Sequence, residues 1–532
     1  MITCYENARV FTADEHTANC FVVRDGVFAF VGTARDAHRA YPDAERVDLH
    51  GQFVCPGFND SHMHLLNLGC MLTQVQLGPA TDSLAHVLSA LSEYTQTHPQ
   101  EAWVLGHCWN QDDFTDEKRY PTRDDLDRVC PDRPCVISRV CGHVAVANSC
   151  ALRLAGIDEQ AHPVDGGRIV TDEFGRPNGV LEENAITLVT RLIPAPDRQQ
   201  LKESLLLAMA HVSRFGVTSV QTDDFVTTKA PFEEVIAAYL EIKAEGRMTV
   251  RVTQQCQLPD MDTLRRFLSL GYRTGWGDEW FRLGPLKLIA DGSLGTRTAL
   301  MNAPYDDAPD TCGIAVYTQE ALDELVLTAH QAGMQIAVHA IGDGAADRVL
   351  NAVERAQALC PRSDARHGIV HAQILTQAQA ARMQRLNMHA YIQPIFLDYD
   401  TTIVYPRLGH RADEAYPAAS LLRRGVTISG GSDSPVEEPD VLTGIQCAVT
   451  RESVTRPSGA PYLPHEALSL YDALLCFTAF GAYASFEETI KGRIAPGMLA
   501  DFTVLAIDPF ETDPSVIHKT PVRLTVVGGK AV

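Results

Sequence analysis

Short apolar runs that end in polar residues alternate with amphipathic stretches through most of the chain. This alternation is typical of parallel strands connected by helices. Clear helical stretches are residues 319–332, followed by Gly333, and residues 345–359. Eight apolar runs fit strands: residues 53–58, 216–221, 249–253, 285–290, 335–339, 368–371, 390–393 and 426–429. Eight strands separated by helices predict an α/β fold, a (β/α)8 barrel, with its active site at the carboxyl ends of the strands.

Both chain ends show a different pattern, in which apolar and polar residues alternate around Gly and Pro turns. Residues 19–32 carry Asp25-Gly26 between two apolar runs, which strongly indicates a two-residue hairpin turn. Residues 493–505 and 524–532 alternate in the same way. We therefore expect a small β-sandwich formed by residues 1–52 and 489–532, on either side of a barrel at residues 53–488.

About 150 residues separate the first predicted barrel strand from the second, far more than a helix and two loops require. This segment contains strand-like WVLGH and CVISRVCGHVAVAN, a helical stretch at residues 82–97, and glycine-rich turns at residues 166–167 and 177–179. We expect an inserted subdomain at about residues 70–210. A loop that leaves the carboxyl end of a barrel strand lies over the active-site mouth.

Composition narrows the classes of partner. The chain has 45 Lys and Arg against 67 Asp and Glu, a net charge of −22, and no basic run, which argues against nucleic acid. No apolar run is long enough for a membrane span, and the N-terminus lacks a secretory pattern. The 14 cysteines are scattered, as free cytosolic thiols are. We expect a cytoplasmic protein with a small-molecule substrate. Whether the protein forms a homodimer stays open.

Histidines recur at the ends of the predicted strands. His62 and His64 are one residue apart in VCPGFNDSHMHL, so in an extended strand both imidazoles share a face and can bind one ion. His339 closes IAVH, His371 closes GIVH, and Asp433 follows TISGGS. Each of these has an ordinary interpretation, as a hydrogen-bonded strand-end histidine or a turn aspartate. Their recurrence around one barrel favours a metal site.

Lys287 is unusual because it lies inside the apolar run LGPLKLIADG. A buried ammonium is costly unless it is paired or neutralised. One explanation is an ion pair with Asp291 or another nearby carboxylate. The other is carbamylation by CO₂, which would turn the amine into a carboxylate able to bridge two metals. The sequence leaves both open.

Six residues together resemble the metal ligands of the amidohydrolase superfamily, and more narrowly of its YtcJ-like amidohydrolase 3 branch: His62, His64, Lys287, His339, His371 and Asp433. Seven phrases, in order across essentially the whole chain, support the resemblance: PGFNDSHMH, GHVAVANSCAL, LKLIADGSLGTRTA, VHAIGDGAADRVLNAVE, HAQ, GGSDSPV and GRIAPGMLADFTVL. The resemblance implies a metal-dependent (β/α)8 barrel flanked by a β-sandwich. It also implies activities such as the hydrolysis of N-substituted formamides.

The resemblance further implies one or two zinc ions, or another divalent metal, held by those six residues. A metal-activated water would attack a carbonyl carbon. Asp433 would accept the proton of the water and deliver it to the leaving nitrogen. Lys287, if carbamylated, would bridge two metals, and with one metal His339 or His371 could polarise the carbonyl instead.

Candidate substrate-binding residues are less clear. Trp109 and Asp112 in GHCWNQDDF, and His143 in CGHVAVAN, are polar or aromatic residues of the predicted insertion. Trp109 has an equally good interpretation as subdomain core, because aromatic side chains dominate cores. Gln393 follows the seventh predicted strand and Asp291 follows the fourth, where a polar residue could also serve only a turn.

These features predict a metal-dependent hydrolase that cleaves an amide-type C–N bond of a small organic molecule. One alternative is a deaminase of a ring amidine, which typically uses one metal without a bridging lysine. A second alternative is a binding protein on a non-catalytic amidohydrolase frame, which usually loses metal ligands. Metal content and turnover of N-acyl and N-formyl compounds would separate the three.

Overall fold

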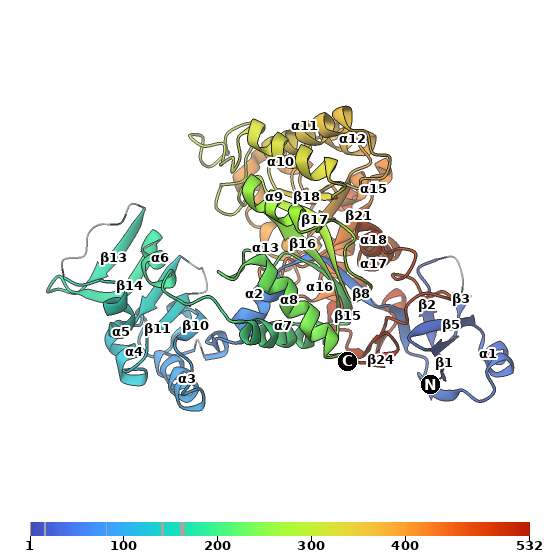
Figure 1. Cartoon of the computed structure of the whole chain (residues 1–532), viewed down its shortest axis with the longest axis horizontal. Coiled ribbons are helices and arrows are strands. Elements are labelled where there is room, and N and C mark those ends of the chain that lie inside the picture. Colours follow the sequence, from blue (N-terminus) through green and yellow to red (C-terminus); the bar gives the residue numbers. More distant parts are fainter. Residues whose placement is uncertain (1, 15–16, 81, 140–142, 160–163, 165) are drawn as a thin grey trace. The chain divides into compact units, whose positions relative to one another are not determined.

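The computed structural model describes residues 2–14, 17–80, 82–139, 143–159, 164 and 166–532 (Figure 1). Across these residues the chain forms two compact units. The barrel unit comprises Met1–Leu65, Ala208–Thr227 and Pro231–Val532, and the inserted unit comprises Leu66–Leu207 and Thr228–Ala230. In the part of the chain described, no helix combines the length and the apolar composition needed to cross a membrane.

The barrel unit is built on a parallel sheet with eight strands among the described residues. In chain order they are β8 (Phe58–Met63), β15 (Val217–Thr222), β16 (Arg251–Gln257), β17 (Phe281–Ile289), β18 (Ile336–Ala340), β19 (Gly368–His371), β20 (His389–Ile392) and β21 (Ile428–Gly430). The first and last strands meet where Ser61 Oγ donates to Gly430 O at 2.7 Å and Asp433 N donates to His62 O at 2.8 Å. The predicted (β/α)8 barrel is confirmed.

Helices connect the strands and lie outside them (Figure 1). The predicted helices at residues 319–332 and 345–359 are α10 (Gln319–Gln331) and α11 (Asp343–Leu359). Thr318 caps α10 by accepting from Ala321 N, which satisfies one amide that the helix leaves free. Further helices between and after the barrel strands include α8 (Phe232–Ala244), α9 (Met261–Ser269), α12 (Gln377–Arg385), α15 (Ala418–Arg424), α16 (Val441–Thr450) and α17 (Leu470–Cys476), and α7 (Arg198–Ser213) leads into β15.

Two mixed sheets lie in the terminal segments, and the second of them combines strands from both chain ends. One contains β1 (Ile2–Glu6), β4 (Cys20–Arg24), β5 (Val27–Gly32) and β6 (Glu45–Asp48), and the other contains β2 (Arg9–Phe11), β3 (Thr17–Ala18), β7 (Phe53–Pro56), β22 (Phe502–Leu505), β23 (Val522–Val527) and β24 (Lys530–Ala531). Asp25 and Gly26 have φ of 52° and 80° between β4 and β5, as the predicted hairpin requires. A shared core that includes Phe21, Phe28 and Phe502 confirms the predicted sandwich.

The apolar run at residues 53–58, predicted as one barrel strand, forms two strands. β7 pairs with β2 and β22 in the terminal sheet, whereas β8 begins at Phe58 and pairs with β15. Gly57 separates them, and a Cβ there would lie 2.2 Å from the Thr218 side chain. Hydrophobicity does not mark this break, because both strands are buried on both faces.

The inserted unit has a sheet of its own in the order β13-β14-β12-β11-β10-β9. Its strands are β9 (Val75–Gln76), β10 (Val104–Trp109), β11 (Cys135–Arg139), β12 (Val144–Ala147), β13 (Gly167–Thr171) and β14 (Pro177–Glu183). Its longest helix is α3 (Leu84–Thr97), within the stretch predicted as helical. The glycine-rich turn predicted at residues 177–179 is instead the start of β14, because Gly179 there lets the backbone approach Ala147 and Arg123 closely.

Candidate metal centre

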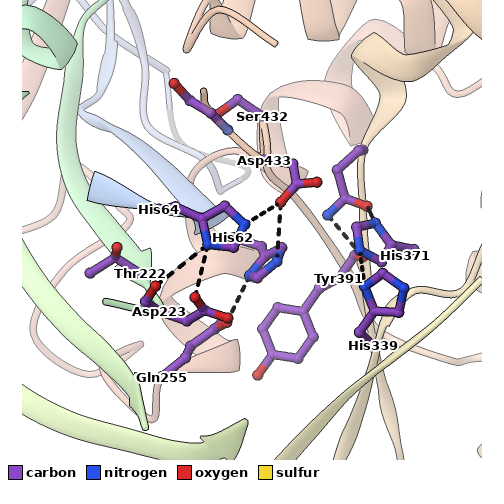
Figure 2. Close-up of polar contacts among 12 residues, drawn as sticks. His62, His64, Thr222, Asp223, Gln255, His339, His371, Tyr391, Ser432 and Asp433 are labelled. Atoms are coloured by element: carbon purple, nitrogen blue, oxygen red, sulfur yellow. Dashed lines mark hydrogen bonds and ion pairs between the residues drawn. The ribbon is translucent and has the colours of Figure 1, made fainter. Parts of the chain in front are cut away.

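The side chains of His62, His64 and Asp433 converge at the carboxyl end of the barrel strands (Figure 2). His62 Nε2 and His64 Nε2 lie 3.3 Å and 3.0 Å from Asp433 Oδ1. Two ligand atoms about 2.0–2.1 Å from a tetrahedral zinc lie about 3.3 Å apart, so this spacing fits a shared ion. The structure therefore brings together three of the predicted metal ligands.

Backbone contacts hold this group together. Asp433 N donates to His62 O at 2.8 Å, and His64 N donates to Ser434 O at 2.7 Å. Asp433 itself has φ of 59°, a left-handed conformation that non-glycine residues seldom adopt and that often occurs at functional sites. The loop after β21 is thus bound to the end of β8, and the carboxylate is presented to both imidazoles.

His62 and His64 are each oriented by a polar contact with a further side chain, as Figure 2 shows. His62 Nδ1 lies 2.7 Å from Gln255 Oε1, and His64 Nδ1 lies 2.8 Å from Asp223 Oδ1. Both acceptors favour a proton on Nδ1, which leaves Nε2 free to bind a metal. Asp223 follows β15 and Gln255 lies in β16, and the sequence predictions included neither.

His339 and His371 form a second pair beside the first. His371 Nε2 lies 2.9 Å from His339 Nδ1, and His371 Nδ1 lies 2.7 Å from Gln393 Oε1. The ring centroids of His62 and His371 are 5.7 Å apart. Burial lowers the pKa of His339 to about 4 and that of His371 well below its usual value, so both rings are neutral, the form in which imidazole binds metals.

Burial and neighbouring charged groups together set the pKa values of His64 and Asp433. Burial lowers the pKa of His64, but Asp223 and Asp433 outweigh it, and the pKa stands well above its ordinary value. Burial raises the pKa of Asp433, but hydrogen bonds from His62 and His64 hold it well below the usual range. Asp433 is therefore a carboxylate at neutral pH, as both a metal ligand and a proton acceptor require.

Lys287 lies in β17 with 1% of its side chain exposed. Its Nζ is 2.9 Å from Asp223 Oδ2 and 3.2 Å from His62 Nε2. The nearby carboxylate is thus Asp223 rather than Asp291, and it gives the ion-pair explanation a partner. Carbamylation stays a prediction, and Nζ also lies beside His62, one of the predicted metal ligands.

Asp291 is engaged by backbone amides. Its carboxylate accepts from Leu300 N at 2.9 Å, Ile341 N at 3.1 Å and Gly342 N at 2.8 Å. Burial raises its pKa to about 7 although these donors act in the opposite direction. Asp291 Oδ1 also lies 3.4 Å from His339 Nε2. It therefore ties the loop after β17 to the loop after β18, and its contact with substrate stays a prediction.

The three candidates in the inserted unit have different surroundings. Trp109 is fully buried in the core of that unit, with its ring 5.7 Å from that of Tyr120. Asp112 is exposed and forms an ion pair with Arg139 at 2.9 Å. His143 is exposed and lies 3.0 Å from Glu183. Trp109 thus has the surroundings of a core residue, and contact of the three with substrate stays a prediction.

Comparison with known proteins identifies the family. The sequence profile described as the Amidohydrolase family matches residues 45–532. The chain belongs to the amidohydrolase family. A Bacillus subtilis relative, YtcJ, is 36% identical over 515 residues, which cover 96% of this amidohydrolase and 95% of the relative. An Arthrobacter pascens protein named N-substituted formamide deformylase is 28% identical, with coverage of 98% and 96%.

A solved structure supports the same assignment. A metal-dependent hydrolase of Pyrococcus furiosus superposes with a TM-score of 0.80 at 28% identity, covering 96% of this amidohydrolase and all of that chain. The family resemblance drawn from the sequence is therefore confirmed. The chain is a hydrolase of a metal-dependent family, and its barrel contains a His-His-Asp candidate metal site.

Proposed function

We propose that this amidohydrolase is a zinc-dependent enzyme that hydrolyses an amide-type C–N bond of a small organic molecule. The observation that carries the proposal is the convergence of His62, His64 and Asp433 beside the neutral pair His339 and His371. The similarity to a protein named N-substituted formamide deformylase, over 98% of this chain, favours formamides as the substrate class.

His62, His64 and Asp433 would hold the metal, because their donor atoms face one another within 4.8 Å. Imidazole nitrogen with carboxylate oxygen is a donor set that suits zinc. A divalent ion bound there would supply an activated water with a pKa of about 7 and would polarise a carbonyl oxygen. Gln255 and Asp223 keep both rings in the tautomer that presents Nε2.

Asp433 is the residue that moves the proton. Its Oδ1 faces the two imidazoles, and beside them its pKa lies well below the usual range, so it is ionised at neutral pH. It accepts the proton of the attacking water and then delivers that proton to the leaving nitrogen, acting first as base and then as acid. Without that second transfer the amine is a poor leaving group.

His339 and His371 have one of two roles, depending on the metal count. With two ions, His339 and His371 would hold the second, and a carbamylated Lys287 would supply a further ligand. With one ion a neutral imidazole of this pair donates a hydrogen bond to the substrate carbonyl. The contact between Lys287 Nζ and Asp223 Oδ2 at 2.9 Å supports the single-ion arrangement, because the ammonium already has a partner.

The test is a substrate panel measured beside metal analysis of the purified protein. We expect formate release from N-substituted formamides, with at least one equivalent of zinc per chain. The control is the same panel with His62→Asn, which removes one ligand and should lower both metal content and turnover. Ammonia release from ring amidines without formamide turnover would instead favour a deaminase, and the absence of turnover at full metal occupancy would favour a binding protein.

A further inference from the structure

The described residues contain a second group of potential metal ligands, separate from the candidate metal centre. It consists of Cys4, Glu6 and His38, each of which offers one atom within 4.8 Å of the other two. Cys4 and Glu6 are in β1, and His38 is in α1 (Ala34–Ala40). Thiolate sulfur, imidazole nitrogen and carboxylate oxygen are the three donor types that bind zinc in proteins.

The local structure places these three side chains together between a strand and a helix. Cys4 and Glu6 are two residues apart in β1, so both side chains leave the same face of the strand. Cys4 packs with Ala37 of α1 in a small apolar core. His38 is the next residue of the helix, and its Nε2 contacts Glu6 Oε2. One ion at this position would be bound by both the strand and the helix.

A second thiol lies beside the sulfur of Cys4. Cys20, at the start of β4, is fully buried, and its Sγ is 3.4 Å from Cys4 Sγ. Two sulfurs that bind one tetrahedral zinc at about 2.3 Å would lie about 3.8 Å apart. The shorter spacing fits a hydrogen bond between the two sulfurs, and contacts of this kind orient metal ligands.

The group is open to solvent on one side. The side chains of Glu6 and His38 are 21% and 32% exposed, whereas Cys4 is 1% exposed. The sulfur is therefore at the buried end of the group, and the two polar ligands are at its exposed edge, beside a position that water can occupy. The contact between His38 and Glu6 accounts for these two side chains by itself, but it does not require a thiol beside them.

We propose that Cys4, Glu6 and His38 bind a zinc ion that fastens α1 to β1, a structural site distinct from the catalytic one. A thiolate ligand favours zinc over Mg²⁺ and Ca²⁺, which prefer oxygen ligands. Cys4 releases its thiol proton to solvent when the metal binds. The helix has seven residues, too few to be stable by itself, so bonds from one ion to helix and strand would stabilise this segment.

Cobalt(II) is the probe, because a cobalt–thiolate bond gives a charge-transfer absorption band and the group His62, His64 and Asp433 contains no thiol. Metal-free full-length protein, reduced with a phosphine, is titrated with cobalt(II) and then with zinc. We expect a thiolate band that saturates at one cobalt per chain and disappears when zinc, which binds such donors more tightly, replaces cobalt. Cys4→Ser should abolish the band, and Cys20→Ser, the same change at the neighbouring sulfur, should retain it.

His38→Gln is the second variant, in case Cys4→Ser fails to fold, because His38 is partly exposed. Since even the loss of an outer contact to a ligand costs about 10–100-fold in metal affinity, this variant should bind cobalt at the thiolate site at least about tenfold more weakly. It should also lose one zinc per chain with kcat unchanged. The matched control is His86→Gln, which removes an exposed histidine paired with Asp82 and should leave the band as it is.

Hydrogen exchange gives a local measurement at the helix. Zinc should slow the exchange of the amides of residues 34–40 in the wild type and not in His38→Gln, because the ion would suppress local opening of α1. No thiolate band in the wild type, a band that persists in Cys4→Ser, unchanged cobalt affinity in His38→Gln, or loss of the band in Cys20→Ser would each overturn the proposal.

The result does not depend on the proposed hydrolytic function, because the thiolate band is measured without turnover. In His38→Gln, the zinc bound per chain should report the catalytic site alone.

Discussion

Asp433 lies against two imidazoles, so the replacement of one of its carboxylate oxygens by an amide nitrogen is an informative test of its role. Asp433→Asn keeps the size of the side chain but cannot accept a proton from water. General acid–base catalysis contributes about 10²–10⁴-fold, so we expect kcat to fall by that factor while the protein stays folded. The measurement is kcat beside circular dichroism and zinc content. A rate near that of the wild type would rule out the proton-transfer role.

At the scale of single residues, the sequence indicated the candidate metal ligands better than the residues that orient them. His339 and His371 could be predicted because each closes an apolar run at the end of a barrel strand, and His62 and His64 because they are one residue apart at the end of another strand. Asp223 obeys the same rule, directly after β15, and could have been found by it. Gln255 could not be predicted, because the sequence does not indicate which residue an amide inside a strand will contact across the barrel.

At the scale of elements, one buried ion pair connects the barrel to the C-terminal segment. Arg251 in β16 donates from Nε to Asp501 Oδ2 at 2.6 Å and from Nη2 to Oδ1 at 3.0 Å. Asp501 also accepts from Gly528 N at 2.8 Å. Both charged side chains are almost fully buried, at 2% and 5% exposure, so each depends on the other.

Arg251→Met should lower the free energy of unfolding by about 3–5 kcal/mol, because it leaves Asp501 buried and unpaired. The measurement is urea-induced unfolding monitored by fluorescence. The control Arg265→Met removes an exposed ion pair with Glu324 and should change stability by at most about 1 kcal/mol. The double variant Arg251→Met/Asp501→Leu should recover part of the loss. Equal, small effects of Arg251→Met and Arg265→Met would contradict this account.

The elements themselves were largely predictable, because buried parallel strands form continuous apolar runs that strand statistics favour. The failures occurred where hydrophobicity does not change. Residues 53–58 are apolar throughout, yet β7 and β8 belong to different sheets and only the crowding at Gly57 marks the break. Residues 177–179 contain Pro and Gly, yet they open β14.

At the scale of the whole molecule, we predict that the barrel unit supplies the chemistry and the inserted unit the selectivity. All the described candidate ligands lie in the barrel unit. His143→Ala should therefore change the relative kcat/KM of several amides by an amount equivalent to about 1–3 kcal/mol, with zinc content unchanged. Trp109→Ala is the comparison: it opens a cavity in a core and should destabilise the inserted unit by about 3–5 kcal/mol.

The measurements for this prediction are kcat/KM across the amide panel, zinc content and thermal unfolding. Equal losses with every substrate in His143→Ala would assign that residue a purely structural role. Loss of zinc in the same variant would show that a metal ligand had been placed in the wrong group.

The central claim is that the site around His62, His64 and Asp433 hydrolyses amides through a bound divalent metal. The most direct test is to strip the purified protein with a chelator, restore zinc in steps, and follow formate release from an N-substituted formamide beside the zinc bound per chain. The account predicts that activity is lost with the metal and returns in proportion to the zinc that rebinds. Full activity in the stripped protein would contradict it.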